Sequence, residues 1–247
     1  MRRDQWQIRS SQLGGEATVV AYGHYGKPFI VFPSERGSPW DFENNGMIGA
    51  VADLIEAGRV KLYAVSSHDA ASWSNSSIDL ESRAQIHLDY ESWILDDVVP
   101  AIWNDCDGLV DIGLTGASMG AFHALNFALR HAEKFDTALC MSGNYDSSSW
   151  HGWGEREMHA YFTNPHDYVP NLGGAHLDWL RSRVHLVLVA GQGQWEDTTG
   201  ALDSTRYIGG LLRDRDMHCK VDLWGYDVPH DWPSWRRQFA HHLPRLI

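Results

Sequence analysis

GASMG, at Gly116–Gly120, is the most informative stretch of this sequence. It fits the pattern G-x-S-x-G, with a strand-like run before it at residues 110–114 and a helical pattern after it at residues 119–130. The backbone must turn sharply between strand and helix, so side chains two residues before and after the serine would collide, and both positions need glycine. We therefore predict that the Ser118 hydroxyl projects from a strained turn at the carboxyl end of a strand.

Short apolar runs alternate with helical patterns on both sides of this turn. The run at residues 184–190 (VHLVLVA) is almost continuously apolar, which is typical of a parallel strand buried on both faces. Such an alternation predicts an α/β fold with a mostly parallel central sheet flanked by helices. The other strand-like runs are 17–22, 28–33, 61–65, 110–114, 137–141 and 219–224, and the helical patterns are 46–57, 80–103, 119–130, 207–215 and 232–243.

Three finer features follow from the same pattern. The runs at 17–22 and 28–33 are separated by a short turn, so we expect an antiparallel hairpin at the N-terminal edge of the sheet. The helix at 80–103 should bend near Pro100, because proline removes a helical hydrogen bond. Periodicity fails between Tyr145 and Trp179, which predicts an irregular cap insertion at about 145–180.

The length of the chain bears on the number of domains, and its net charge bears on the partners that it can bind. The 247 residues suit one domain over 1–247, without an internal repeat or linker. The 32 acidic residues against 20 basic ones give a net charge of -12, which disfavours binding to nucleic acid and to anionic membranes. The sequence leaves the oligomeric state open and is compatible with a homo-oligomer.

Cysteine usage and apolar runs bear on the location of the protein. Cys106, Cys140 and Cys219 are far apart, so the sequence indicates neither a disulfide framework nor a zinc-binding spacing. No apolar run approaches the roughly 20 residues of a spanning helix, and none follows the N-terminal arginines as in a secretory signal. We therefore expect a cytoplasmic protein that does not enter a membrane.

A candidate base for the serine lies near the C-terminus. A serine hydroxyl becomes an effective nucleophile only when a base takes its proton, and after a turn of this kind the partners follow in the order acid, then His. His230 lies on a loop after the run at 219–224 and directly before the closing helix, which makes it the candidate base. His241 and His242 compete, but periodicity places them inside that helix.

Two adjacent acids follow the run at 184–190, and either can complete the set. Glu196 lies three residues after Gly193, a common spacing at this strand end, so we favour it. Asp197 is the alternative, because Asp is the more frequent acid in Ser-acid-His triads. The acid that is not used would cap the following helix near Thr198, where the helix dipole favours a negative charge.

An anion formed during acyl transfer needs two backbone N–H donors. Met119 should supply one, because it follows the nucleophile at the start of a helix. The second should come from the loop after the run at 28–33, where Ser34 and Glu35 are both candidates.

The cap insertion is rich in aromatic residues and histidines. We expect it to fold over Ser118, with Trp150 and Trp153 as walls of a substrate pocket that favours short-chain or aryl groups. We expect no metal and no cofactor in catalysis. Gly191-Gln192-Gly193 lacks the rest of a dinucleotide fingerprint, and no H-E-x-x-H pair occurs among the cap histidines His151, His159, His166 and His176.

The order of these motifs resembles the esterase branch of the α/β-hydrolases, which includes enterochelin-esterase-like proteins, S-formylglutathione hydrolase and the mycolyltransferase antigens. The resemblance implies the α/β-hydrolase fold and the hydrolysis of a small-molecule carboxylic ester. It implies no particular natural substrate, because the substrates of this family are diverse. The matching stretches are FIVFPS at 29–34 with WDF at 40–42, GASMGAFH at 116–123, SGNYD at 142–146, residues 191–197, and HDW at 230–232 with Trp235.

Three functions are compatible with these residues. The first is a carboxylesterase, and the second is an acyltransferase in which an alcohol intercepts the acyl-enzyme. The third is a binding protein that kept the fold without activity, which the intact set of serine, acid and histidine disfavours. Product analysis with an added alcohol acceptor would separate the first two.

Overall fold

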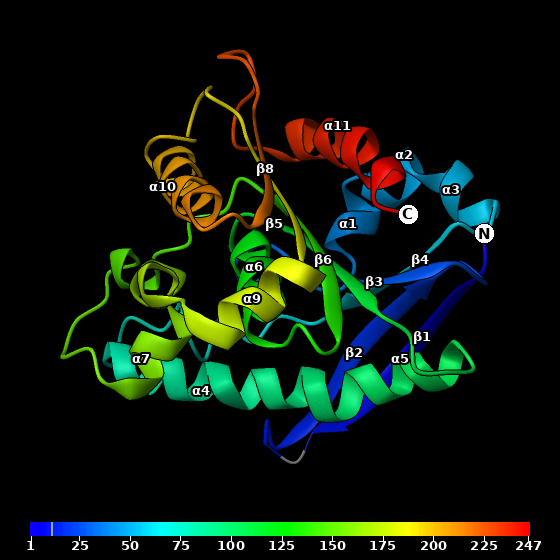
Figure 1. Cartoon of the computed structure of the whole chain (residues 1–247). Coiled ribbons are helices and arrows are strands. Elements are labelled where there is room, and N and C mark those ends of the chain that lie inside the picture. The colour runs from blue at the N-terminus through cyan, green and yellow to red at the C-terminus, as the bar shows by residue number, and fades with distance from the viewer. Residues whose placement is uncertain (11) are drawn as a thin grey trace.

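A mostly parallel sheet of eight strands forms the centre of the computed structural model, which describes residues 1–10 and 12–247 (Figure 1). The strands lie in the order β1-β2-β4-β3-β5-β6-β7-β8, and every pair from β4 to β8 in this order is parallel. The predicted fold class is therefore confirmed. The strands are β1 (Arg3–Ser10), β2 (Gly15–Tyr22), β3 (Lys27–Phe32), β4 (Val60–Val65), β5 (Ile112–Ala117), β6 (Phe135–Met141), β7 (His185–Ala190) and β8 (His218–Leu223).

The N-terminal hairpin differs from the predicted one. The predicted pairing of 17–22 with 28–33 is wrong, because β2 pairs with β4, and β3 lies on the far side of β4. The hairpin instead joins β2 to β1, which the sequence analysis missed. β1 reads RDQWQIRS and alternates exposed with half-buried residues, so it carries too few apolar side chains to be recognised as a strand.

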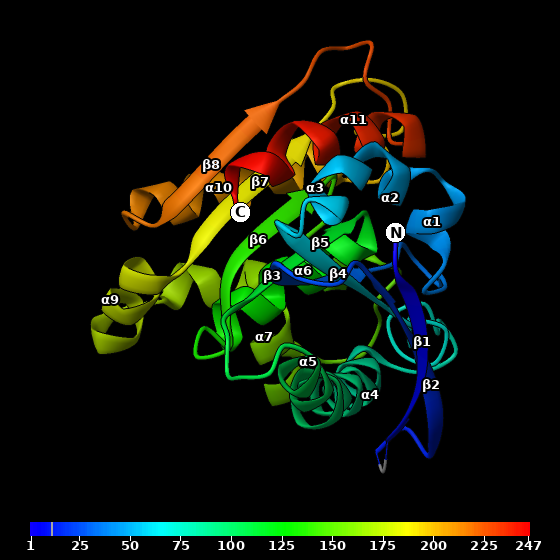
Figure 2. The ribbon, with the colours of Figure 1, turned by 90° about the vertical axis from the view of Figure 1, so that its right-hand side faces the viewer.

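Helices cover both faces of the sheet (Figure 2). One face packs against α4 (Leu80–Trp93), α5 (Val99–Asp105), α6 (Met119–Arg130), α9 (Gly174–Arg183) and α10 (Ala201–Asp214). The other face packs against α1 (Asp41–Asn44), α2 (Met47–Ala50), α3 (Ala52–Glu56) and α11 (Trp232–His242). Every residue of α6 except Arg130 is buried, so this helix sits at the centre of one layer.

Two predicted helices are divided by local features. The pattern at 46–57 forms α2 and α3, separated at Val51. The pattern at 80–103 is continuous, but a π-helical turn, η1 (Ile94–Val98), joins α4 to α5 directly before Pro100. Pro100 cannot donate a helical hydrogen bond, which fits a wider turn just before it, and the bend expected there stays a prediction. No helix in the described parts of the chain is long and apolar enough to cross a bilayer.

The cap segment at 145–180 is more regular than its sequence suggests. It contains η2 (Ser147–Ser149), α7 (Met158–Thr163), α8 (Pro165–Tyr168), η3 (Val169–Asn171) and the start of α9. Glu81 on α4 holds the start of α7, because its carboxylate accepts the N–H groups of His159 and Ala160, each at 2.9 Å. A carboxylate at a helix N-terminus is electrostatically favourable. Tertiary contacts of this kind stabilise helices whose own periodicity is weak.

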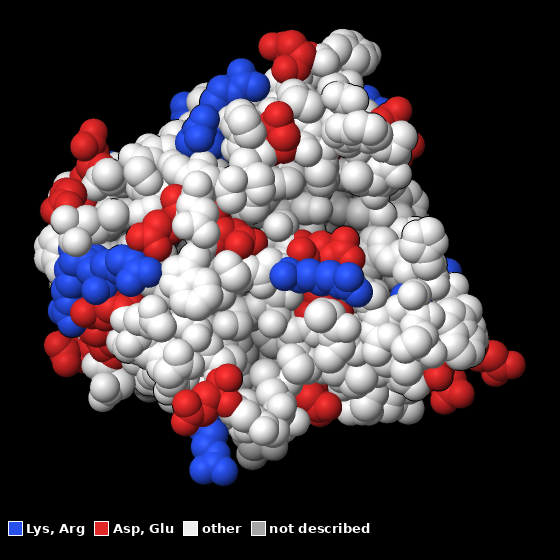
Figure 3. Space-filling view, turned by 180° about the vertical axis from the view of Figure 1, so that it is seen from behind, with Lys and Arg blue, Asp and Glu red and all other residues white. Residues whose placement is uncertain are grey.

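Charged side chains are mixed on the surface. On the face shown in Figure 3, Lys and Arg stand beside Asp and Glu and do not form a continuous basic field among the described residues.

A buried ion pair ties α4 to the end of α6. Glu91 accepts hydrogen bonds from Arg130 Nη2 at 2.8 Å and Arg130 Nε at 3.1 Å, and His131 Nε2 lies 3.0 Å from the same carboxylate. Burial alone would raise the pKa of Glu91, but the close contact with His131 and the charge of Arg130 outweigh it and lower the pKa to about 2.

This pair should make the stability of the fold sensitive to acid. Because the pKa of Glu91 is lower in the folded chain than in the unfolded chain, its contribution is complete above about pH 5 and is lost as the pH falls towards 2. Glu91→Gln should lower the free energy of unfolding at pH 7 by about 3 kcal/mol, and the difference from wild type should shrink between pH 5 and 2. Urea denaturation across this range measures both effects. A difference that stays constant with pH would contradict the assignment.

Candidate active site

The turn at Ser118 depends on two close backbone contacts. Ser118 stands between β5 and α6 with φ 57° and ψ -121°, a conformation that is strained for a residue with a side chain. A Cβ on Gly116 would lie 2.3 Å from the backbone of Gly120, and a Cβ on Gly120 would lie 2.5 Å from the carbonyl oxygen of Phe32. Neither position has room for any side chain, which is why the pattern requires both glycines.

Ser118 is the first member of a hydrogen-bonded chain of three side chains. Its Oγ lies 3.0 Å from Nε2 of His230, and Nδ1 of His230 lies 3.2 Å from Oε2 of Glu196. In the tautomer with the proton on Nδ1, the serine O–H donates to Nε2 and the Nδ1–H donates to the carboxylate. His230 can therefore accept the serine proton while Glu196 stabilises the charged ring.

The structure brings only one of the two candidate acids to His230. Glu196 is fully buried, and its Oε1 accepts the O–H of Ser142 at 2.6 Å and the N–H of Gly191 at 3.1 Å. Asp197 is exposed and accepts the N–H of Thr198 at 2.8 Å. Three donors thus compensate the buried carboxylate of Glu196. Asp197 borders the cavity beside Ser118, but its carboxylate makes its hydrogen bond to the turn that follows it and not to His230.

Ser142 is a site residue that the sequence analysis did not assign. It follows β6 with φ 52°, and its own N–H donates to the carbonyl oxygen of Val189 at 2.6 Å. This geometry aims its hydroxyl at Glu196. The available signal was its place directly after a core strand, within the stretch SGNYD at 142–146.

The loop that carries His230 packs tightly against the loop that carries Glu196. The N–H of His230 donates to the carbonyl oxygen of Gln194 at 2.9 Å, and the Trp235 ring meets the imidazole edge-on with centroids 4.9 Å apart. A Cβ on Gly191 would lie 2.0 Å from the carbonyl oxygen of Val228. The two loops can therefore come this close only because residue 191 is a glycine. His241 and His242 lie in the last turn of α11, as the periodicity indicated.

Candidate oxyanion donors lie at the mouth of the same site. Met119 is the first residue of α6, where backbone N–H groups have no acceptor within the helix, and it borders the cavity beside Ser118. The turn after β3 closes with the N–H of Gly37 donating to the carbonyl oxygen of Ser34 at 2.9 Å, and Glu35 borders the cavity. Glu35 also accepts the Ser74 hydroxyl at 2.6 Å. The choice between Ser34 and Glu35 as second donor stays a prediction.

A cavity of about 610 Å³ opens beside Ser118 and His230. Trp150 forms part of its wall and packs edge-on against Trp73 at 5.8 Å and Phe122 at 4.8 Å between ring centroids. Trp153 does not line the cavity, contrary to expectation. It is 53% exposed, and its indole N–H donates to the carbonyl oxygen of Ser76 at 3.1 Å. From the cap segment, Ser149, Trp150 and His151 reach the cavity, while α7 lies along α4 (Figure 1).

Arg83 on α4 holds the cavity wall together. The side chain is almost fully buried, and its guanidinium donates to the carbonyl oxygens of Ile78 at 3.1 Å, Trp150 at 2.9 Å and His151 at 3.2 Å. It thereby joins the loop after β4 to the start of the cap. Sequence reasoning missed it, because an arginine in an amphipathic helix usually faces solvent.

Solved structures with the same fold cover nearly the whole chain. A ferulic acid esterase has a TM-score of 0.73 and 15% identity, covering 99% of this chain and 97% of its own. MPT51 of Mycobacterium tuberculosis has a TM-score of 0.77 and 14% identity, covering 100% and 98%. An S-formylglutathione hydrolase from Agrobacterium tumefaciens has a TM-score of 0.71 and 14% identity, covering 98% and 93%. At these identities the likeness shows the fold alone.

Sequence comparison gives a second, independent result. No curated protein sequence matches the chain. The family model "Putative esterase", however, matches residues 40–246, a range that includes Ser118, Glu196 and His230. Because this match covers most of the sequence, the chain belongs to the esterase family that the model describes.

Proposed function

We propose that this protein is a serine carboxylesterase that hydrolyses short-chain or aryl esters through an acyl-enzyme. The observation that carries the proposal is the chain of contacts from Ser118 to His230 to Glu196 beside a cavity. The family match supports ester hydrolysis as the reaction class.

Each residue has a defined part in the proposed reaction. Ser118 Oγ attacks the acyl carbon while His230 Nε2 takes the hydroxyl proton, and the carbonyl oxygen becomes an anion. The N–H of Met119, at the positive end of α6, and an N–H from Ser34 or Glu35 would stabilise this anion. The tetrahedral intermediate collapses, the alcohol leaves with the proton from His230, and the acyl group stays on Ser118.

Water completes the cycle by the same route. His230 takes a proton from a water molecule, whose oxygen attacks the acyl carbon, and the proton then returns to Ser118 as the carboxylic acid leaves. Glu196 keeps the proton on Nδ1 before the attack and stabilises the imidazolium after it. Ser142 and Gly191 hold Glu196 in place, so Ser142 acts as a positioning residue.

The size of the cavity supports a small-molecule ester as the partner. A volume of about 610 Å³ lies within the usual range of small-molecule sites. The Trp73 and Trp150 rings, which meet edge-on, make one part of the wall apolar, which suits an aryl group or a short acyl chain.

Exchange of the two adjacent acids tests the proposed triad. Glu196→Gln should lower kcat by about 10⁴-fold, because an amide neither fixes the tautomer of His230 nor stabilises its charge. Asp197→Asn should change kcat by about threefold or less, since Asp197 is exposed at the cavity and its carboxylate makes no hydrogen bond to His230. Hydrolysis of p-nitrophenyl acetate measures both variants, with Ser118→Ala as the inactive reference.

Two outcomes would contradict this assignment. Equal and mild losses from both acid variants would mean that neither acid belongs to the triad. A larger loss from Asp197→Asn would reverse the roles. Ser142→Ala should fall between the two acid variants in kcat, because it removes one of three donors from Glu196.

Trp150 and Trp153 form a matched pair for testing the pocket. Trp150→Ala should enlarge the cavity and move the optimum for kcat/KM towards longer acyl chains, by about fivefold for each methylene that it accommodates. Trp153→Ala should leave the chain-length profile unchanged, because this side chain lies outside the cavity. A series of p-nitrophenyl esters from acetate to decanoate gives the profiles. An unchanged profile for Trp150→Ala, with only a lower Tm, would assign this tryptophan to packing.

A further inference from the structure

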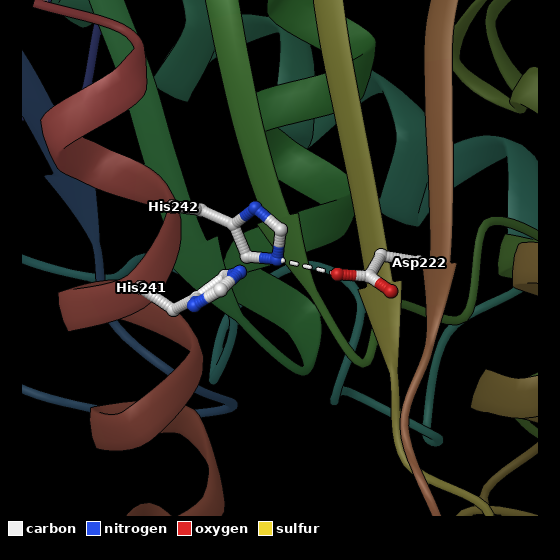
Figure 4. Close-up of side chains that lie close together, drawn as sticks. All are labelled: Asp222, His241 and His242. Carbon is white, nitrogen blue, oxygen red and sulfur yellow. Dashed lines mark ion pairs between the residues drawn. The ribbon is translucent and has the colours of Figure 1, made fainter.

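Two histidines and an aspartate meet at the end of the sheet where β8 passes α11 (Figure 4). His241 and His242 belong to the last turn of α11, and Asp222 lies near the end of β8. One ligand atom from each side chain can be chosen so that all three lie within 4.8 Å of one another. In Figure 4 the rings of His241 and His242 both lie on the side of α11 that faces Asp222.

His242 faces the carboxylate without a satisfactory hydrogen bond. Its side chain is only 2% exposed, and Nε2 lies 3.0 Å from Oδ2 of Asp222. Nevertheless this nitrogen has no hydrogen-bond partner among the described residues, because the carboxylate does not meet it in a suitable direction. A buried polar atom with a close but misaligned neighbour is costly, and a cation between the two atoms would satisfy both.

The spacing suits a tetrahedral metal ion. Ligands at about 2.0–2.1 Å from zinc in a tetrahedron are separated by about 3.3 Å, close to the present distance between His242 and Asp222. His241 is exposed, so small movements of its ring can bring it to the same distance, and water can take the remaining position. Imidazole with carboxylate is a ligand set that zinc and similar divalent metals favour over magnesium or calcium.

We propose that Asp222, His241 and His242 bind a divalent transition metal of the zinc class, and that the bound metal ties β8 to α11. The negative end of the α11 dipole favours a cation at this place. Trp224 supplies an outer contact, because its indole N–H donates to Oδ2 of Asp222 at 3.3 Å. The positive charges of Lys220 and Arg245 lie near enough to His242 to repel a bound cation. The three ligands must therefore bind the metal strongly enough to overcome this repulsion.

The proposed metal would close a loop that contains the base of the active site. β8 is an edge strand that pairs only with β7 in the described sheet, and the segment from 224 to 231 connects it to α11. His230 lies at the end of this segment. A bridge from Asp222 to His241 and His242 would therefore fix the strand end before this segment to the far end of the helix after it, without placing the metal in the reaction.

Thermal unfolding with ZnCl₂ tests the proposal on the intact protein. After EDTA treatment, zinc at about 100 times its Kd should raise the Tm of the wild type by on the order of 5 °C, while MgCl₂ should not. The shift should disappear in His241→Ala and in Asp222→Asn. His218→Ala is the matched control, because His218 is another exposed histidine on β8 and its ring stacks on His185 at 5.1 Å.

Cobalt gives a second readout that does not depend on stability. Co²⁺ bound to these ligands should produce visible absorption typical of four-coordinate cobalt, with one equivalent bound by the wild type and by His218→Ala. Hydrolysis of p-nitrophenyl acetate should be unchanged by EDTA. Zinc effects that persist in His241→Ala but vanish in His218→Ala would assign the metal to the His185–His218 pair and overturn the proposal. No Tm shift and no cobalt absorption in the wild type would overturn it as well.

Discussion

The active site is built around the close contact between the end of β5 and the start of α6. Gly116 and Gly120 touch backbone to backbone, and Gly120 also lies against the end of β3. This contact leaves Ser118 with a positive φ of 57°, a strained conformation for a residue with a side chain, at the head of α6. It also places the turn after β3 beside the serine, because no side chain separates them. One steric requirement therefore sets the positions of Ser118, the proposed nucleophile, and of both candidate sources of N–H donors.

The parallel strands bring the remaining groups to the same edge. Ser142 follows β6, Glu196 follows β7, and His230 follows β8, and the carboxyl ends of neighbouring parallel strands lie side by side. Buried polar groups then fix these loops: Ser142 and Gly191 hold Glu196, and Arg83 holds the carbonyl groups of the cavity wall. Loss of any of these partners would leave a buried charge or donor unsatisfied, so the site and the local fold stabilise each other.

Features could be predicted from the sequence where they depend on local sterics or on the spacing of apolar residues. The pattern around Ser118, the buried strand at 185–190 and the order of acid and histidine all have such causes, and the structure brings Ser118, Glu196 and His230 together. Prediction from the sequence failed where tertiary contacts decide the outcome. β1 has a mostly polar sequence and is held by β2, and α7 begins where Glu81 accepts its N–H groups. Arg83, Ser142 and the outward position of Trp153 likewise depend on neighbours far away in the sequence.

The proposed reaction requires that Ser118 is the nucleophile and that His230 is its base. Reaction of the protein with a fluorophosphonate, followed by mass spectrometry of the intact chain and of its peptides, tests this most directly. We expect one adduct per chain, on the peptide that contains Ser118, and a rate of labelling that falls by orders of magnitude in His230→Ala. An adduct on another residue, or labelling of Ser118 at an unchanged rate without His230, would contradict it.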